Sequence, residues 1–267
     1  MDFIIYLMSG AFAGFIAGLF GIGGGLIVVP ILCIVFTQLN YDPAIVMHMA
    51  IGTSLSTMII TSTSSVLTHH HHGNVMWPVF RYLSIGMIVG SLSGAAIANL
   101  LPSHALQLII GLFALWIAYQ MFQDAKVEVD TSRHLPRAPL QVLTGGGIGF
   151  ASAIFGIGGG SFTVPYLTHH GVVMQKAVGT SAACGLIISI VATIGFIWFG
   201  SQKSIAIAGA IGYVNIYAFI GISMMSFITA GFGAKAANKL PAGILKKYFS
   251  VLMLVVASYF FYQFYRH

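Results

Sequence analysis

Apolar stretches of about 20 residues recur along the whole chain, and they limit what it can fold into. A helix of about this length is what crosses the hydrocarbon layer of a bilayer. Only 6% of the 267 residues are charged, against roughly a quarter in soluble domains, so the chain cannot cover an aqueous surface. We therefore predict an all-α polytopic membrane protein whose main surroundings are the lipid bilayer.

The basic residues that give a net charge of +6 lie between the apolar segments. They form no cluster with interleaved aromatic residues, so we expect no binding to nucleic acid and interpret them as topology determinants. The N-terminus has no basic n-region and no Ala-x-Ala-like site, so no cleaved signal peptide is expected. Cys33 and Cys184 lie far apart in apolar segments and offer no disulfide framework, metal site or cofactor site.

Three short motifs occur twice, in the same order. The pairs are GLFGIGGGLIVVP and AIFGIGGGSFTVP (Gly18–Pro30 and Ala153–Pro165), AIGTS and AVGTS (Ala50–Ser54 and Ala177–Ser181), and GAAIANLLP and GAKAANKLP (Gly94–Pro102 and Gly233–Pro241). Repeated motifs in one order indicate two homologous halves. We place the halves at residues 1–123 and 139–267, joined by a polar linker at 124–138.

Each half should contain a helix that ends at glycines, a short apolar helix and three longer helices. We expect these helices at Phe3–Phe20, Leu26–Phe36, Ala44–Thr68, Val75–Ala98, Ala105–Phe122, Leu140–Phe155, Ser161–Thr168, Met174–Phe199, Ile205–Phe232 and Ile244–Tyr265. Pro30 and Pro165 are expected to limit the short helices, because proline removes a donor and clashes with the preceding turn.

The positions of the basic residues indicate whether the two halves have the same or opposite orientations in the membrane. If the glycines merely interrupt one crossing, the halves are parallel and the basic residues divide evenly between the two sides. If the short helix turns back, as a crossing or as half of a re-entrant hairpin, the halves are inverted. One side then holds nine of the 11 basic residues: Arg81, Lys126, Arg133, Arg137, Lys176, Lys235, Lys239, Lys246 and Lys247. Cytoplasmic loops carry such an excess, so we predict inverted-topology repeats in the inner (plasma) membrane, with a cytoplasmic linker and both termini outside.

The glycine motifs suggest an anion site. Inverted repeats with broken helices are typical of transporters that bind substrate near mid-membrane. A half-helix that begins at Gly25 or Gly160 would direct unpaired N–H groups and its positive dipole end into a cavity. Close helix packing is the alternative role for these glycines. A phosphate-binding loop of the Rossmann or Walker type is excluded, because no strand, Gly-Lys-Ser/Thr or acidic ribose ligand accompanies the motif.

Hydroxyl and imidazole groups supply the remaining candidates. Hydroxyls near the GTS motifs (Thr53, Ser54, Ser56, Thr57, Thr180 and Ser181) could donate to the oxygens of a bound anion or bond back to their own helix. Asn74 and Asn215 are weaker candidates. No Asp or Glu lies in a predicted crossing, so the usual carboxylate relay is missing and His48 is the candidate for proton coupling, with a loop or interface role as the alternative. His69–His72 are interpreted as a solvated helix end, because consecutive histidines point in different directions.

The paired glycine motifs followed by proline, the GTS motifs and the NLLP and NKLP ends resemble the TauE/SafE sulfite exporter family of membrane transporters. The resemblance covers essentially the whole chain and implies movement of sulfite, thiosulfate, sulfoacetate or related organosulfonates. The positions that match the family motifs, and that we take as candidate substrate-binding or motif residues, are Gly21, Gly23, Gly24, Gly25, Pro30, Thr53, Ser54, Gly156, Gly158, Gly159, Gly160, Pro165, Thr180 and Ser181.

Three functions remain open at this point. A secondary transporter of small sulfur-containing anions is the first hypothesis, and a passive anion channel with the same pore is the second. A metal transporter that depends on His69–His72 is the third. An enzyme is the least favoured, because no nucleophile–base pair or metal triad can be assembled. No oligomeric state is assigned.

Overall fold

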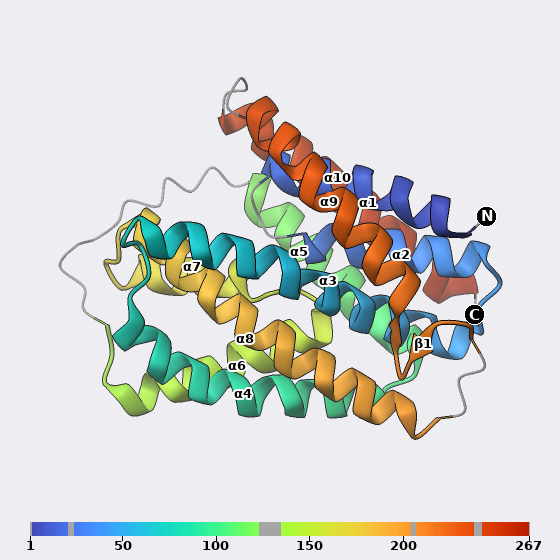
Figure 1. The fold of residues 1–267 in the computed structure, drawn as a ribbon, viewed down its shortest axis with the longest axis horizontal. Helices are drawn as coiled ribbons and strands as arrows, with labels where there is room; N and C mark the ends of the chain where they lie inside the picture. The colour runs from blue at the N-terminus through green and yellow to red at the C-terminus, as the bar shows by residue number, and fades with distance from the viewer. Residues whose placement is uncertain (1, 21–23, 123–134, 204–206, 238–241, 267) are drawn as a thin grey trace.

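The computed structural model describes residues 2–20, 24–122, 135–203, 207–237 and 242–266. Gly21, Gly23 and residues 124–134 of the linker lie outside the described residues. Over the described residues the chain forms ten helices and one small hairpin (Figure 1). The elements are α1 (Asp2–Phe20), α2 (Gly25–Gln38), α3 (Pro43–His71), α4 (Trp77–Leu100), α5 (Ser103–Phe122), α6 (Ala138–Phe155), α7 (Gly160–His169), α8 (Met174–Ser201), β1 (Ala210–Ile211), β2 (Val214–Asn215), α9 (Ile216–Ala237) and α10 (Ala242–Arg266).

Seven of the described helices are long and apolar enough to cross a membrane, namely α3, α4, α5, α6, α8, α9 and α10. Two further apolar helical stretches, Phe3–Leu19 and Gly25–Gln38, are shorter. Large apolar side chains on the outer faces of these helices, such as Val89, Leu143 and Phe227, are exposed, as expected where lipid is the solvent. These features confirm the prediction of an all-α polytopic membrane protein.

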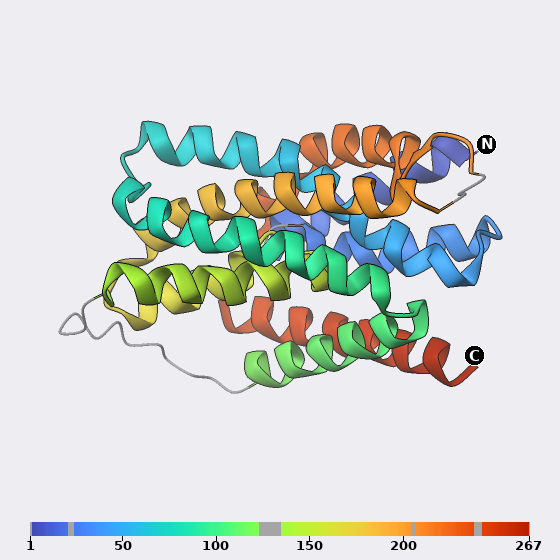
Figure 2. The ribbon, with the colours of Figure 1, turned by 90° about the horizontal axis from the view of Figure 1, so that it is seen from below.

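The short helices α2 and α7 begin at Gly25 and Gly160, as predicted from the glycine motifs. Each follows a longer helix that ends near the glycines, α1 before α2 and α6 before α7. In Figure 2, α2 runs back toward the end of the molecule that carries the N-terminus mark. The C-terminus mark lies at that same end, whereas α6 begins at the opposite end (Figure 2).

The helix packing follows the correspondence between the two halves. Helix α1 packs along α9, and α6, which carries the second copy of the α1 motif, packs along α4. Helices α3 and α8 pack against each other, as do α5 and α10. Every main pairing thus has its counterpart when the two halves are exchanged.

Glycines on the long helices, outside the GIGGG motifs, allow close helix packing. Gly10, Gly14 and Gly18 recur every fourth residue of α1, and a Cβ on any of them would collide with the backbone of α9. Gly86 and Gly90 of α4 face the backbone of α6 in the same way. Small residues at such spacing let membrane helices approach closely.

Two expectations are wrong. Pro30 and Pro165 lie inside α2 and α7 and do not limit them. Each proline removes one helix hydrogen bond, and neighbouring helices in a membrane protein can compensate for such a loss. The helix expected at Ile205–Phe232 begins only at Ile216, after the hairpin of β1 and β2. Gly209 and Gly212 have φ values of +76° and +55°, which a continuous right-handed helix does not allow.

Candidate anion-binding site

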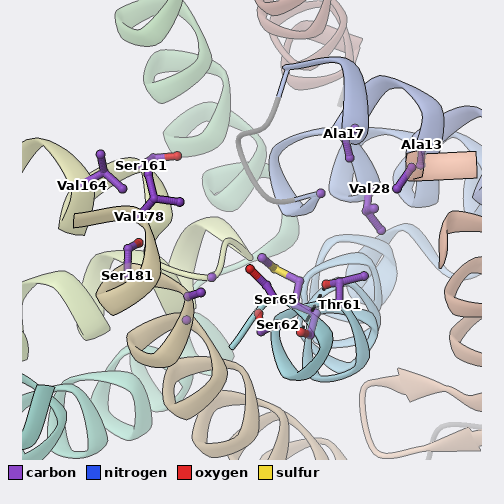
Figure 3. Close-up of a pocket in the computed structure, with 18 of the residues that line it drawn as sticks. Ala13, Ala17, Val28, Thr61, Ser62, Ser65, Ser161, Val164, Val178 and Ser181 are labelled. Atoms are coloured by element: carbon purple, nitrogen blue, oxygen red, sulfur yellow. Dashed lines mark hydrogen bonds between the residues drawn. The ribbon is translucent and has the colours of Figure 1, made fainter. Parts of the chain in front are cut away.

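The two glycine breaks border one cavity of about 580 Å³ in the interior of the bundle (Figure 3). Gly24 from the first break and Gly158 and Gly160 from the second all line it. The cavity extends along the C-terminal halves of α3 and α5 and the N-terminal half of α8. It therefore occupies the half of the molecule away from the ends of α1 and α10 that carry the termini (Figure 1).

The two glycine breaks are in direct contact with each other. Gly25 lies so close to the second break that a Cβ on it would be 2.5 Å from the Gly156 carbonyl and 3.0 Å from Ile157 Cα. Gly156 and Gly159 have φ values of +69° and +73°, in the left-handed region that favours glycine. Gly24 differs, because its backbone is right-handed helical and a Cβ on it would meet nothing nearer than 3.6 Å.

Both short helices direct their N-termini at this region. The Gly24 carbonyl accepts from the N–H groups of Ile27 and Val28, at 3.1 and 2.9 Å. The Gly159 carbonyl likewise accepts from the N–H groups of Phe162 and Thr163, at 3.1 and 2.8 Å. The first N–H groups of a helix have no partner within it and carry the positive end of its dipole. Because Gly160 and Ser161 line the cavity, this positive end faces the space that a ligand would occupy.

A stripe of hydroxyls on α3 forms the polar wall. Thr57, Thr61 and Ser65 recur every fourth residue, on one face of the helix, and Ser62 lies beside them. Thr57 and Thr61 donate to the carbonyls of Ser54 and Met58, at 2.7 and 3.3 Å. Thr61, Ser62 and Ser65 were missed as candidates, although their spacing in the sequence was the signal that could have found them. Further polar lining comes from Gln120, Ser161, Ser181 and Ser226.

The threonines of the GTS motifs brace the fold and do not line the cavity. Thr53 Oγ1 accepts from the N–H of Asn215 at 3.0 Å, and Thr180 Oγ1 accepts from the N–H of Met76 at 2.9 Å. Ser54 donates to the Gly156 carbonyl at 3.1 Å. Thr53, Ser54 and Thr180 are buried, and of the GTS residues only Ser181 lines the cavity.

The other polar candidates lie away from the cavity. His48 Nε2 lies 3.0 and 3.1 Å from the carbonyls of Ala98 and Leu101, and its ring stacks on Tyr213. Asn215 accepts from the N–H of Ala218 and donates to Tyr41, so it caps α9. Neither His48 nor Asn215 is among the lining residues, and Asn74 is not either.

The histidine run is at the end of α3. His70, His71 and His72 are exposed, and His72 Nδ1 lies 2.7 Å from the Thr68 carbonyl. Trp77 donates to His70 Nδ1 at 3.3 Å. Within the described part of the chain, no group of three or more His, Cys, Asp or Glu side chains is arranged to hold a metal ion.

Comparison with known proteins identifies the family of the chain. The model of the sulfite exporter TauE/SafE family matches residues 6–260. The chain belongs to this family. Among its TauE/SafE relatives, a probable membrane transporter protein of Haemophilus influenzae is 36% identical over 255 residues, which cover 95% of this chain and 96% of the relative. One from Methanocaldococcus jannaschii is 28% identical over 250 residues, 93% of this chain and 90% of the relative. No solved structure matches the chain.

Proposed function

We propose that this TauE/SafE protein is a secondary transporter of small sulfur-containing anions, such as sulfite, thiosulfate, sulfoacetate or related organosulfonates. One observation carries the proposal: Gly24 and Gly160, the glycines next to the two helix breaks, line the same cavity although 136 residues separate them. Two half-helix N-termini around one cavity are suited to an anion. The halves, 1–123 and 139–267, act in this proposal as inverted repeats around that site.

The lining favours an anion that carries an organic part. Among the described lining residues none is charged, so helix N-termini, neutral hydroxyls and the amide of Gln120 are the polar groups that meet the ligand. The other walls are apolar and include Met58, Trp116 and Phe249. Pockets for organic ligands typically measure about 300–1,000 Å³, and this cavity falls within that range. An organosulfonate would use both kinds of wall, whereas bare sulfite would use only the polar one.

The conformation described here is the inward-facing one in this proposal. The cavity lies toward the ends of α3 and α5 and the start of α8, which the charge distribution assigns to the cytoplasm. At the other end, Tyr41, His48 and Asn99 of the first half bond to or stack on Tyr213 and Asn215 of the second. In this proposal, these contacts close the path toward the outside.

Ligand binding to the purified protein tests the proposal. A ligand that binds the folded state raises the unfolding temperature by mass action. We expect a rise with at least one of sulfite, thiosulfate, sulfoacetate and benzenesulfonate, and no rise for Gly24→Leu, whose side chain would enter the cavity. If none of these anions raises the unfolding temperature at millimolar concentration, the substrate class is wrong.

A passive anion channel is the second candidate. The observation that favours it is that the described lining contains no carboxylate and no histidine to carry a coupled proton. Uphill accumulation of the anion, driven by a proton gradient across a proteoliposome membrane, separates a coupled transporter from a channel.

A further inference from the structure

Two buried hydroxyls next to the second glycine break have no assigned role. Ser152 on α6 and Thr163 on α7 are completely buried, and neither Ser152 Oγ nor Thr163 Oγ1 finds a hydrogen-bond partner among the described residues. A Cβ on Gly159, the residue before α7, would lie 3.5 Å from Ser152 Oγ and 3.6 Å from Thr163 Oγ1. Both hydroxyls therefore border the same point beside the N-terminus of α7.

The first half carries apolar side chains at the matching positions. Ala17 and Val28 lie 135 residues before Ser152 and Thr163, the offset between the two glycine motifs. A Cβ on Gly24 would lie 3.6 Å from Ala17 Cβ and 3.6 Å from Val28 Cγ2. Threonine has nearly the shape of valine, and serine is alanine with one added hydroxyl. The side chains beside the two glycines therefore differ by two hydroxyl groups, and the backbones differ as well, because Gly24 is right-handed helical and Gly159 is left-handed. Ala17 and Val28 line the cavity, as Figure 3 shows, but Ser152 and Thr163 do not.

An isoleucine covers the point that the hydroxyls border. Ile188 Cδ1 would be 2.6 Å from a Cβ on Gly159, and the Ile188 side chain is completely buried. The corresponding residue of the first half, by the offset of 127 between the GTS motifs, is Thr61, which lines the open cavity. Gly158 and Gly160 of the second break line the open cavity, but an apolar side chain covers the point beside Gly159, whereas the matching residues of the first break line the cavity.

We propose that Ser152 and Thr163, together with the N-terminus of α7, form an oxyanion subsite that opens when Ile188 moves away. The positive end of α7 disfavours a cation at this place, and both hydroxyls can donate to the oxygen atoms of a sulfonate or sulfite group. This subsite rests on the proposed function, in which the two repeats move against each other so that the site faces each side of the membrane in turn. The open cavity then binds the anion on one side of the membrane, and the subsite binds it in the outward-facing state.

Isosteric replacement tests the role of the hydroxyls. The double variant Ser152→Ala/Thr163→Val gives the second break the residues of the first. Loss of hydrogen bonds to a charged group should raise the KM for sulfoacetate uptake into proteoliposomes on the order of tenfold or more. The unfolding temperature should stay the same or rise, because two unpartnered buried hydroxyls are removed. The matched control is Thr193→Val, since Thr193 Oγ1 is also buried without a described partner but lies further along α8. A double variant with wild-type KM overturns the subsite.

Thiol accessibility tests the opening even if sulfoacetate is not the substrate. In a background with Cys33→Ala and Cys184→Ala, we place a cysteine at Thr163 and add a charged methanethiosulfonate reagent from the outside. If the subsite opens toward the outside, the reagent should label the cysteine of Thr163→Cys, and it should do so faster when Ile188→Ala is added. A cysteine at Thr193 serves as the unlabelled control. If Thr163→Cys is not labelled while the wild type transports sulfoacetate, the proposed function stands and the subsite is wrong.

Discussion

Thr53 Oγ1 accepts a hydrogen bond of 3.0 Å from the backbone N–H of Asn215, 162 residues further along the chain. Its counterpart in the other GTS motif, Thr180, accepts a bond of 2.9 Å from the N–H of Met76. The glycine before each threonine makes this approach feasible: a Cβ on Gly52 would lie 2.8 Å from the Tyr213 carbonyl. Each half thus holds the segment that leads into a long helix of the other half, and the GTS motif is a brace between the halves.

Thr53→Val should therefore destabilise the protein without changing its affinity for substrate. The substitution keeps the shape of the side chain but leaves the buried N–H of Asn215 without an acceptor, which costs about 1–3 kcal/mol. Thermal unfolding of the purified protein measures the loss. Thr63→Val is the control, because Thr63 is exposed and donates only to the Ile59 carbonyl of its own helix. Equal unfolding temperatures for Thr53→Val and Thr63→Val would contradict the brace.

The two breaks should respond differently to alanine, although their sequences are nearly the same. Gly159 has a φ of +73° and faces Ile188 Cδ1, so Gly159→Ala introduces backbone strain of about 1 kcal/mol or more together with a steric collision. Gly24→Ala meets only ordinary contacts at 3.6 Å and should leave the unfolding temperature unchanged. Comparison of the two variants by thermal unfolding checks this, and a loss of stability at Gly24 alone would refute it.

The orientation in the membrane can be measured with single cysteines at exposed loop positions. In a background without Cys33 and Cys184, a cysteine at His71 should react only with reagents that reach the cytoplasm. A cysteine at Asn40, in the exposed loop between α2 and α3, should react with an impermeant reagent added to intact cells. The opposite labelling pattern would overturn the charge-based orientation and with it the inward-facing assignment.

Replacement of His69–His72 by four alanines should leave anion transport unchanged. These side chains lie at an exposed helix end outside the cavity, and the described residues offer no metal-binding cluster that they could join. Transport rates of the variant and the wild type in proteoliposomes check the prediction. A rate that falls at least tenfold while the unfolding temperature is kept would instead favour the histidine-dependent hypothesis.

Membrane class, repeat motifs and the starts of the broken helices could be predicted from the sequence, because each depends on local pattern. A run of apolar residues fixes a crossing, and a glycine block fixes where α2 and α7 begin. The hairpin before α9 was missed, because residues 205–216 are as apolar as a membrane helix and the positive φ of Gly209 and Gly212 depends on the packed neighbours.

The roles within the candidate site were harder to predict, because they depend on which segments meet in space. Thr53 and Thr61 are both hydroxyl residues of α3, yet the first binds the backbone before α9 and the second lines the cavity. The sequence makes His48 a coupling candidate, and it cannot show that the imidazole lies against the C-terminal end of α4 and stacks on Tyr213. Only the long-range contacts separate these cases.

The most direct test of the central claim is the uptake of labelled sulfoacetate into proteoliposomes that contain the full chain, with a proton gradient imposed across the membrane. The account predicts accumulation above the external concentration by the wild type, collapse of that accumulation when the gradient is abolished, and no uptake by Gly24→Leu despite an unchanged unfolding temperature. Uptake by Gly24→Leu at the wild-type rate would contradict the claim that the anion binds in the cavity bordered by the two glycine breaks.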